Sequence, residues 1–480
     1  GFVWIENGLG NITPTLYILP WTLLSAVCVL APSAYLLYIR KFNLFHPLVL
    51  EAWIYVFPAF IVGSFFLAFG WVDPYYLSLI DDPTYNLPLS LVYISVGFLG
   101  LTAGFFIPVG QYVSDLIAPR LPAWHWRPGQ VWLPGTLLLC IGISFNVLAF
   151  LQGLVGYQKS VKVEPFDGLL SFLVAVLGVG TLLLWLGVFS TKRRGPVFYG
   201  IIVVLLILVP VNAAVAGSRG SLLSSLIQIA YCFVAAGRKL NLRVAFAFGV
   251  IGLLALVLGM AYGTSFRNIK GSEARTSSGD YFGQVVATID YFSTEDPNIV
   301  IQQTAEALTG RIENLSSVAV VVANYERLAP YEESYGLENN ILNDFYTSFI
   351  PRFIWNEKPR TSDPRALGDL YFNYGENSFA ISPFADLLRN FGPIGVPLGM
   401  FVLGIYLRSV YAALIDTPHP EMWKKVAYFV LLPAVSYEGF YAAIFPTTLR
   451  LVLVLAITLW LTNLIATRFL PRQHRTVQHV

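Results

Sequence analysis

Residues 191–226 read TKRRGPVFYGIIVVLLILVPVNAAVAGSRGSLLSSL. Three cations at 192–194 precede a long apolar run, and a polar turn that contains Arg219 separates this run from a second apolar stretch. An α-helix needs about 20 apolar residues to cross the hydrocarbon core of a bilayer. The stretch therefore predicts a transmembrane helix with cations at one end and a tight turn at the other.

The rest of the chain has a similar composition. Its 480 residues are 56% hydrophobic and 12% charged, with a mean hydropathy of +0.64, whereas about a quarter of the residues of a soluble domain are charged. The apolar runs are continuous rather than alternating, which excludes an outer-membrane barrel. We predict an all-α polytopic membrane protein, and the formal charge of +2 gives no indication of nucleic-acid binding.

Eleven apolar segments are long enough to be transmembrane helices. They lie near 17–38, 46–69, 87–109, 131–155, 168–190, 196–216, 220–237, 244–264, 392–414, 425–446 and 449–467. Because the chain begins with Gly rather than Met, we expect a preceding segment with room for one more helix. Cys28, Cys140 and Cys232 lie inside apolar runs, which argues against a disulfide framework.

The orientation follows from the distribution of Lys and Arg between alternate connections, because cytoplasmic loops carry an excess of these residues. One set of connections is rich in cations, at Arg40, Lys41, Arg120, Arg127, Lys192, Arg193, Arg194, Arg238, Lys239, Arg243, Lys424, Lys425, Arg468, Arg472 and Arg475. The short loops of the opposite set carry only Lys159, Lys162, Arg219 and Arg450. The first set is therefore predicted to be cytoplasmic.

This topology divides the chain into three parts. Residues 1–264 hold the N-terminal transmembrane helices, 265–391 form a large periplasmic loop, and 392–480 hold the C-terminal helices and a cytoplasmic tail. A connection as long as 265–391 needs structure of its own, and we expect it to be mostly helical, with helical periodicity over 298–328. Residues 340–355 are apolar enough to lie on the membrane surface or to dip into it.

The stretch SFIPRFIWNEKPRTSDPR, residues 348–365, concentrates positive charge in this loop. The loop has ten cations and seventeen acids, a net charge of −7, so the basic stretch is a local feature. Its four cations are Arg352, Lys358, Arg360 and Arg365, and three prolines stiffen the chain between them. Arginine binds phosphate oxygens with two parallel hydrogen bonds, which suits a diphosphate. Surface ion pairs with loop carboxylates are the alternative, and both interpretations stay open.

Three further cations lie on the predicted outer side. Arg219 stands at or just below the membrane boundary, where an ionisable residue indicates either a functional site or contact with lipid headgroups. Arg267 begins the large loop, and Arg450 stands at the outer end of the last helix. We include Arg219, Arg267 and Arg450 in the candidate diphosphate site.

Two carboxylates are candidates for proton transfer. Counting about 1.5 Å per residue from Lys425 along a continuous helix places Glu438 roughly 20 Å up, in the outer half of the bilayer. There it pairs with Arg450 or takes part in catalysis. Asp386 precedes the helix at 392–414 and serves either as a helix-start acid or as a catalytic base. All five His residues are predicted to be cytoplasmic, so an outer base is a carboxylate, a Tyr or absent, and no metal or cofactor motif is visible.

The arrangement resembles the Wzy-type O-antigen and oligosaccharide repeat-unit polymerases. The topology resembles that family over nearly the whole chain, as do the turn AGSRGSLLSSL and the pair IPRFIWNEKPR and ISPFADLLRNFGPIGVPLGMFVLG. The resemblance implies a GT-C-type glycosyltransferase of the bacterial inner membrane that acts on polyprenyl-diphosphate-linked glycans at the periplasmic face. O-antigen ligases, which are related, carry a periplasmic His that this chain lacks on its predicted outer side.

In the interpretation that the resemblance supports, the cations hold the diphosphate leaving group without a metal. Asp386 is the favoured base, and Glu438 orients an Arg; a reaction without a dedicated base is the alternative. Trp355, Tyr371 and Tyr374 stack on sugars or anchor the loop at the interface. The expected partners are lipid-linked donor and acceptor glycans, membrane lipids and a chain-length regulator, with no nucleic acid. A ligase and a lipid-linked oligosaccharide transporter are the alternative functions.

Overall fold

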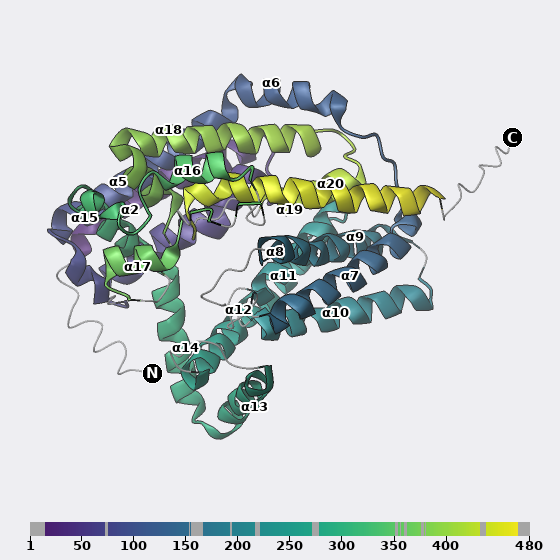
Figure 1. Ribbon diagram of the computed structural model, residues 1–480, viewed down its shortest axis with the longest axis horizontal. Helices are drawn as coiled ribbons and strands as arrows, with labels where there is room; N and C mark the ends of the chain where they lie inside the picture. The colour runs from purple at the N-terminus through teal and green to yellow at the C-terminus, as the bar shows by residue number, and fades with distance from the viewer. Residues whose placement is uncertain are drawn as a thin grey trace, which may run out of the picture. The chain divides into compact units, whose positions relative to one another are not determined.

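The computed structural model describes residues 15–72, 75–152, 154, 167–192, 194–216, 221–270, 278–350, 354–355, 357–359, 362–375, 379, 381–432 and 438–468. These residues form helices and turns, and the described part of the chain contains no strand (Figure 1). The prediction of an all-α fold is confirmed for these residues.

In chain order the helices are η1 (Leu16–Ile18), α2 (Leu19–Tyr38), α3 (Pro47–Leu50), η2 (Glu51–Val62), α4 (Gly63–Ala68), η3 (Tyr75–Leu79), α5 (Pro83–Phe106), α6 (Pro108–Ile117), η4 (Ala118–Arg120), η5 (Pro128–Gln130), α7 (Trp132–Leu151), α8 (Asp167–Val174), α9 (Val176–Ser190), α10 (Pro196–Ala216), α11 (Ser221–Ala235), α12 (Leu242–Lys270), α13 (Ser278–Thr294), α14 (Pro297–Ile312), α15 (Leu315–Glu332), α16 (Asn340–Thr347), α17 (Pro364–Phe372), α18 (Pro383–Leu414), α19 (Met422–Leu431), η8 (Tyr441–Ala443) and α20 (Ile444–Arg468). The element η2 is a π-helix, and the other η elements are 3-10 helices.

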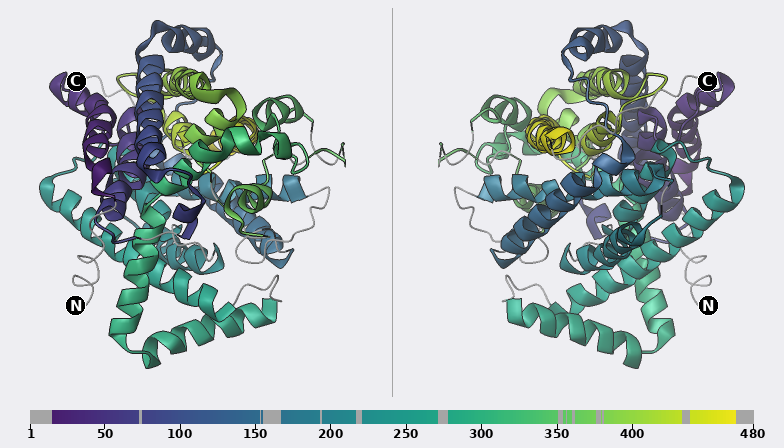
Figure 2. Two further views of the ribbon diagram at one scale, coloured as in Figure 1. Left: turned by 90° about the vertical axis from the view of Figure 1, so that its left-hand side faces the viewer. Right: turned by 90° about the vertical axis from the view of Figure 1, so that its right-hand side faces the viewer.

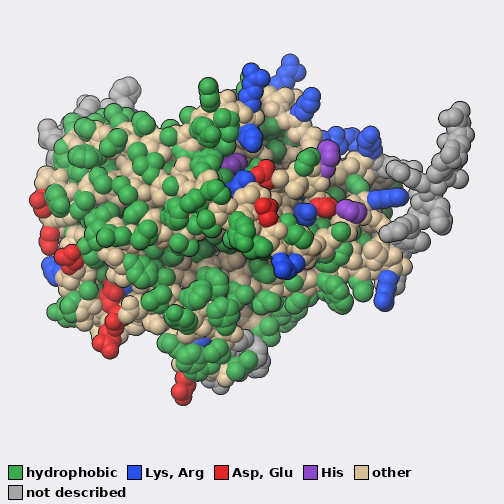
Figure 3. All heavy atoms as spheres, turned by 90° about the horizontal axis from the view of Figure 1, so that it is seen from above, with side chains coloured by type: hydrophobic (Ala, Val, Ile, Leu, Met, Phe, Trp, Pro, Cys, Tyr) green, Lys and Arg blue, Asp and Glu red, His purple; other side chains and the backbone are tan. Residues whose placement is uncertain are grey.

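Nine stretches of the described chain are helical, long enough and apolar enough to cross a membrane. They are Leu16–Tyr38, Pro47–Ala68, Pro83–Phe106, Pro128–Leu151, Gly168–Ser190, Pro196–Val215, Leu242–Phe266, Pro383–Leu414 and Tyr441–Arg468. Figure 3 shows hydrophobic side chains over most of the face that it draws. The chain thus has the architecture of a multi-pass helical membrane protein.

Two of the eleven predicted spans differ in the structure. The segment 220–237 forms α11, whose 15 residues are fewer than a perpendicular crossing needs. The segment 425–446 is not one helix, because α19 ends at Leu431 and residues 438–440 are non-helical before η8 and α20 begin. Pro433 and Gly439 in this sequence both disfavour a helix interior.

The chain forms two compact units. Unit 1 comprises Gly1–Leu121, Ala305–Thr417 and Leu431–Leu449, and unit 2 comprises Pro122–Thr304, Pro418–Val430 and Arg450–Val480. This division cuts across the predicted three-part order, because α15 and α17 of the 265–391 segment belong to the same unit as α5 and α18.

In unit 1, α5 packs closely against α18 and also contacts α2 and α15. The purple and dark blue N-terminal helices of this unit lie side by side in both views of Figure 2. Glycines permit the close approach of α5 to α18: a Cβ on Gly104 would lie 2.0 Å from the carbonyl oxygen of Phe401, and one on Gly404 would lie 2.1 Å from that of Leu101. Small residues at such crossings allow helix backbones to pack tightly in membranes.

A kink at Gly392 divides α18 into two helices. Gly392 has φ of 68° and ψ of −167°, which a residue with a Cβ rarely adopts, and Pro393 disfavours the helical conformation for the residue before it. The second part agrees with the predicted span at 392–414. The first part carries Asp386 and Arg389 on a short helix that Ser382 caps by accepting a hydrogen bond from the N–H of Ala385 (3.3 Å).

The described residues of the segment 265–391 are mostly helical, as predicted. The expected periodic stretch 298–328 forms two helices, α14 and α15, because the chain breaks at Glu313 and Asn314. At this break the N–H of Asn314 donates to the carbonyl oxygen of Ala59 in η2 (3.1 Å). The valine-rich start of α15 is buried against α5 and α18. This part of the segment is thus built into the helical core of unit 1.

Unit 2 is organised around the pair α7 and α9, with α11 packed against α9 and α12. Gly142 and Gly180 allow the close approach of α7 to α9, since a Cβ on Gly142 would lie 2.5 Å from Leu177 Cα. Across α9 and α11, the side-chain amide of Gln228 donates to the hydroxyl of Thr181 (2.8 Å). This unit holds Arg267 on α12 and Arg450 on α20.

Candidate functional site

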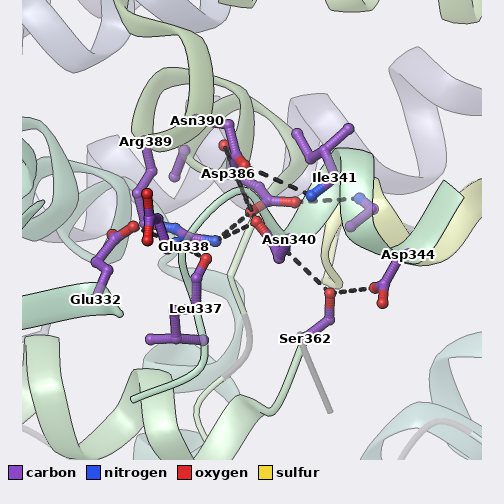
Figure 4. A network of polar contacts seen from close by, with 12 residues as sticks. Glu332, Leu337, Glu338, Asn340, Ile341, Asp344, Ser362, Asp386, Arg389 and Asn390 are labelled. Carbon is purple, nitrogen blue, oxygen red and sulfur yellow. Dashed lines mark hydrogen bonds and ion pairs between the residues drawn. The ribbon is translucent and has the colours of Figure 1, made fainter. Parts of the chain in front are cut away.

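A buried polar network lies in unit 1 where the ends of α15 and α16 meet the first part of α18. Figure 4 shows Asp386, Arg389 and Asn390 of α18 directed towards Asn340 at the start of α16. Asn340 is fully buried, and so are the side chains of Asp386 and Arg389. Elements that lie far apart in the sequence thus share one set of polar contacts.

Arg389 is the centre of this network. Its Nη1 donates to Oε2 of Glu332 (2.7 Å) and to the carbonyl oxygen of Leu337 (2.8 Å). Its Nη2 donates to Oδ1 of Asn340 (2.6 Å) and to Oδ1 of Asp386 (2.9 Å). The guanidinium therefore joins two carboxylates, one amide and the turn after α15.

Both carboxylate oxygens of Asp386 accept hydrogen bonds. Besides Arg389, the side-chain amides of Asn340 and Asn390 each donate to Oδ1 (3.3 Å for both). The backbone N–H of Ala442 donates to Oδ2 (3.1 Å). Asp386 thus connects the network to the segment that precedes α20.

Glu332 and Tyr371 extend the network towards α17. The hydroxyl of Tyr371 donates to Oε1 of Glu332 (2.7 Å). Burial raises the pKa of Glu332, and the guanidinium of Arg389 opposes this shift. Burial and the neighbouring carboxylate of Glu332 raise the pKa of Tyr371, which agrees with its role as a donor. On the side of α16, the hydroxyl of Ser362 donates to Asp344 and accepts from Asn340.

Three contacts fix the segment 438–445. The first is the bond from the N–H of Ala442 to Asp386. In the second, the hydroxyl of Tyr441 donates to the carbonyl oxygen of Gly399 in α18 (2.8 Å). In the third, the ring of Phe445 packs against Phe345 of α16, with centroids 4.5 Å apart. The backbone next to Glu438 is therefore held by both α16 and α18.

Glu438 itself forms an exposed ion pair. Its carboxylate accepts from Nη2 of Arg311, at the end of α14, and the two side chains are 40% and 53% exposed. A carboxylate and a guanidinium thus meet at a surface that solutes and lipids can reach, on a segment that the buried network holds in place. This arrangement can position a proton acceptor beside a cation.

These positions correct two predictions about the carboxylates. The predicted depth places Glu438 inside the outer half of the bilayer, but its side chain is 40% exposed, whereas that of Asp386 is 0% exposed. The depth estimate for Glu438 assumed a continuous helix from Lys425, and the helix ends at Leu431. Asp386 is enclosed by donors, so it is poorly placed to meet an acceptor. The ion pair of Glu438 is formed with Arg311, where we had considered Arg450.

The predicted diphosphate ligands are described only in part. Arg219, Arg352 and Arg360 lie outside the described residues, as does the side chain of Arg267, so the convergence of Arg219, Arg352 and Arg360 stays a prediction. The Nζ of Lys358 donates to the carbonyl oxygens of Thr347 (2.6 Å) and Ile350 (3.2 Å) at the end of α16. Arg365 is half-buried near the start of α17, and Arg450 is exposed on α20 in unit 2.

The predicted sugar-binding aromatics divide into two kinds. Trp355 and Tyr374 are 37% and 38% exposed, and Tyr374 stacks on Tyr75 with centroids 5.6 Å apart. Tyr371 is 3% exposed, so its ring offers no face to a sugar. Its buried position in the network replaces the predicted stacking role.

An apolar surface adjoins the Arg311–Glu438 region through α16. It is formed by exposed side chains of α16 and the residues that follow it, Tyr346, Phe349, Ile350, Ile354 and Trp355. The opposite side of α16 is polar and includes Asn340. The ring of Phe349 packs against Phe445 at the start of α20 (5.7 Å). This amphipathic character agrees with the prediction for 340–355.

Arg311, Glu332 and Asn340 were not singled out in the sequence. Arg311 ends an ordinary polar helix and pairs with a residue 127 positions away, which no local pattern reveals. Asn340 was visible only as the polar start of an apolar stretch. Within the described residues, no group of three or more His, Cys, Asp and Glu side chains could hold a metal ion.

Comparison with known proteins gives no match: no family model, curated protein sequence or solved structure is significantly similar to this chain.

Proposed function

We propose that this protein is a glycosyltransferase that polymerises polyprenyl-diphosphate-linked oligosaccharide repeat units at the periplasmic face of the bacterial inner membrane. The observation that carries the proposal is the exposed Arg311–Glu438 ion pair on a segment that Asp386 holds in place. An apolar surface for a lipid chain lies nearby on α16.

In the proposed reaction, a hydroxyl of the acceptor glycan attacks the anomeric carbon of the donor. A carbon–oxygen bond forms there as the bond from the anomeric carbon to the diphosphate oxygen breaks, and the diphosphate leaves with that electron pair. The acceptor proton passes to Glu438, and a positioned base of this kind contributes about 10²- to 10⁴-fold. Arg311 orients the carboxylate of Glu438.

The leaving diphosphate needs cations to stabilise its developing charge. Arg365 and Lys358 supply charge from the 348–365 stretch, together with Arg352 and Arg360. Lys358 already holds the end of α16, so its proposed contribution is to fix the stretch as well as to add charge.

The lipid and sugar portions of the substrate meet different surfaces. The polyprenyl chain lies along the exposed apolar side of α16, formed by Tyr346, Phe349 and Ile354. Trp355 and Tyr374 contact sugar rings. Asp386 is a positioning residue, because it acts through the N–H of Ala442 and not on the substrate.

The test is chain lengthening by the purified full-length protein with purified lipid-linked repeat units. The proposal predicts a ladder of longer lipid-linked glycans. A transporter would move the lipid-linked unit across a vesicle membrane without changing its length, and a ligase would require a different acceptor lipid. The absence of any ladder from folded protein with both substrates would overturn the proposal.

A further inference from the structure

Glu51 is a carboxylate inside a candidate membrane span. It lies four residues into Pro47–Ala68, its exposure is 0%, and neither of its carboxylate oxygens accepts a hydrogen bond from a described group. Buried carboxylates in proteins are normally paired with cations or hydrogen-bonded. Glu51 therefore requires a separate physical explanation.

Among the described residues, no cation lies close enough to Glu51 to act as its countercharge. Tyr55, on the same helix, interacts with Glu51 electrostatically and is not a cation. His46, five residues earlier, is buried and close to Arg408, and both effects lower the pKa of His46 to about 4, so its imidazole is neutral near pH 7. Arg408 of α18 forms its own ion pair with Asp416 (2.9 Å).

The backbone at Glu51 is also unusual. Glu51 begins η2, a π-helix of 12 residues that packs against α2. Long π-helices are rare, and short π-helical turns occur frequently at functional sites. On α2 the buried Ser33 already accepts a hydrogen bond from Nε1 of Trp53 (3.2 Å). The carboxyl group is therefore enclosed by helices that offer it no charged partner in the described chain.

We propose that Glu51 is a membrane-embedded proton-binding site, whose carboxyl group carries a proton in the folded protein. An isolated ionised carboxylate in an apolar interior is far more costly than a neutral one, so the group neutralises. Release of the proton leaves an unpaired negative charge at the buried start of η2, and this charge is tolerated only if water or a cation enters.

Infrared spectroscopy of the full-length protein in lipid tests the proposal without any glycan substrate. A protonated carboxyl group has a carbonyl band separate from that of a carboxylate, and the band shifts on exchange into D₂O. We expect this band in the wild-type protein at about pH 9, where ordinary Asp and Glu side chains are ionised. Glu51→Gln should remove it.

Glu313 provides the matched control. It is also buried, and its desolvation raises the pKa to about 7, with hydrogen bonds from Ser316 opposing the shift. Glu313→Gln should therefore leave the band at about pH 9 unchanged, because Glu313 is already ionised there. A band that survives in Glu51→Gln would contradict the proposal.

The wild-type spectrum alone keeps the proposal falsifiable if Glu51→Gln fails to fold. Absence of a D₂O-sensitive carboxyl band from wild-type protein at about pH 9 would overturn it. Because these spectra do not depend on glycan transfer, their failure is distinguishable from failure of the proposed polymerase activity.

Discussion

Unit 1 contains two groups of charged side chains that differ in their surroundings. The Glu332–Asp386–Arg389 cluster has side-chain exposures of 6%, 0% and 0%, whereas the Arg311–Glu438 pair is 53% and 40% exposed. Further hydrogen bonds support the cluster: Asn340 Oδ1 accepts from Arg389, and the side-chain amide of Asn390 donates to Asp386. Glu438 of the exposed pair lies on a segment that this cluster fixes through Ala442, whereas Arg311 ends α14.

The comparison separates structural charges from charges available for chemistry. Removing one partner of a buried ion pair leaves an uncompensated charge in a medium of low dielectric constant. An exposed pair contributes about 0–1 kcal/mol, because water screens it and its side chains lose entropy. The Arg311–Glu438 pair is therefore not explained by stability alone, and we assign the reactive role to it.

The largest expected effect is that of Arg389→Met. This change leaves Asp386 and Glu332 buried without their cation, so we expect the free energy of unfolding to fall by about 3–5 kcal/mol. Thermal unfolding in a mild detergent measures the loss. The matched control is Arg311→Met, which should lower stability by less than about 1 kcal/mol. Equal losses in the two variants would remove the distinction between the cluster and the pair.

Glu438→Gln is expected to have the next largest effect, on activity rather than on stability. The amide keeps the shape of the side chain but cannot take the proton from the attacking hydroxyl of the acceptor glycan. Chain lengthening should therefore slow by about 10²-fold or more. Asp386→Asn is the comparison variant, and we expect it to destabilise the fold more than Glu438→Gln does. Near-full activity of Glu438→Gln from about pH 6 to 8 would exclude Glu438 as the base, and near-full activity of both variants would exclude a carboxylate base.

Glu313 differs from both the buried cluster and the exposed pair, because it is a buried acid without a cation among its described partners. Its pKa is about 7 in the folded protein against an ordinary value of 4.5. Between these values the folded state keeps a proton that the unfolded state has lost, so stability falls as the pH rises from 4.5 to about 7. We expect a loss on the order of 3 kcal/mol.

Unfolding measured at several pH values checks this prediction. Glu313→Gln cannot ionise, so its stability should lack this part of the pH dependence. If the variant and the wild-type protein lose the same stability over this range, the pH dependence belongs to other groups.

The smallest expected effects distinguish the two tyrosines. Tyr374→Leu removes an exposed ring, and we expect KM for the lipid-linked substrate to rise by about 2- to 10-fold, equivalent to 0.5–1.5 kcal/mol of aromatic contact. Tyr371→Phe removes the buried donor to Glu332 and should lower stability by about 1–3 kcal/mol with KM unchanged. If KM rises for Tyr371→Phe but not for Tyr374→Leu, then Tyr371 rather than Tyr374 contacts the substrate.

Most of the helices could be predicted from the sequence. A continuous apolar run in a membrane forms a helix, because the backbone must satisfy its hydrogen bonds within the segment. Prediction failed at 425–446, where hydropathy alone does not register the helix break between α19 and η8. It also treated 298–328 as one periodic stretch, although the bond from Asn314 to Ala59 joins residues that no local pattern relates. A tertiary contact accompanies the second break, whereas the first falls in a segment where Pro433 and Gly439 disfavour a helix.

In the candidate site, too, the sequence predicts some residues but not their burial or their partners. Asp386 and Glu438 were identified because isolated carboxylates near apolar helices are uncommon. The predicted depth of Glu438 is wrong because it depends on where α19 ends, and the burial of Asp386 depends on the short helix before the kink at Gly392. Arg311 was missed because a single Arg at the end of a polar helix resembles many surface residues.

Exchanging the charges of the exposed pair tests whether the carboxylate of Glu438 takes part in the reaction. Arg311→Glu combined with Glu438→Arg keeps an ion pair but moves the carboxylate to α14. In the chain-lengthening assay with purified lipid-linked repeat units, we predict a ladder from the wild-type protein and none from the folded double variant. Wild-type protein that forms no ladder, or a double variant that elongates at the wild-type rate, would contradict the account.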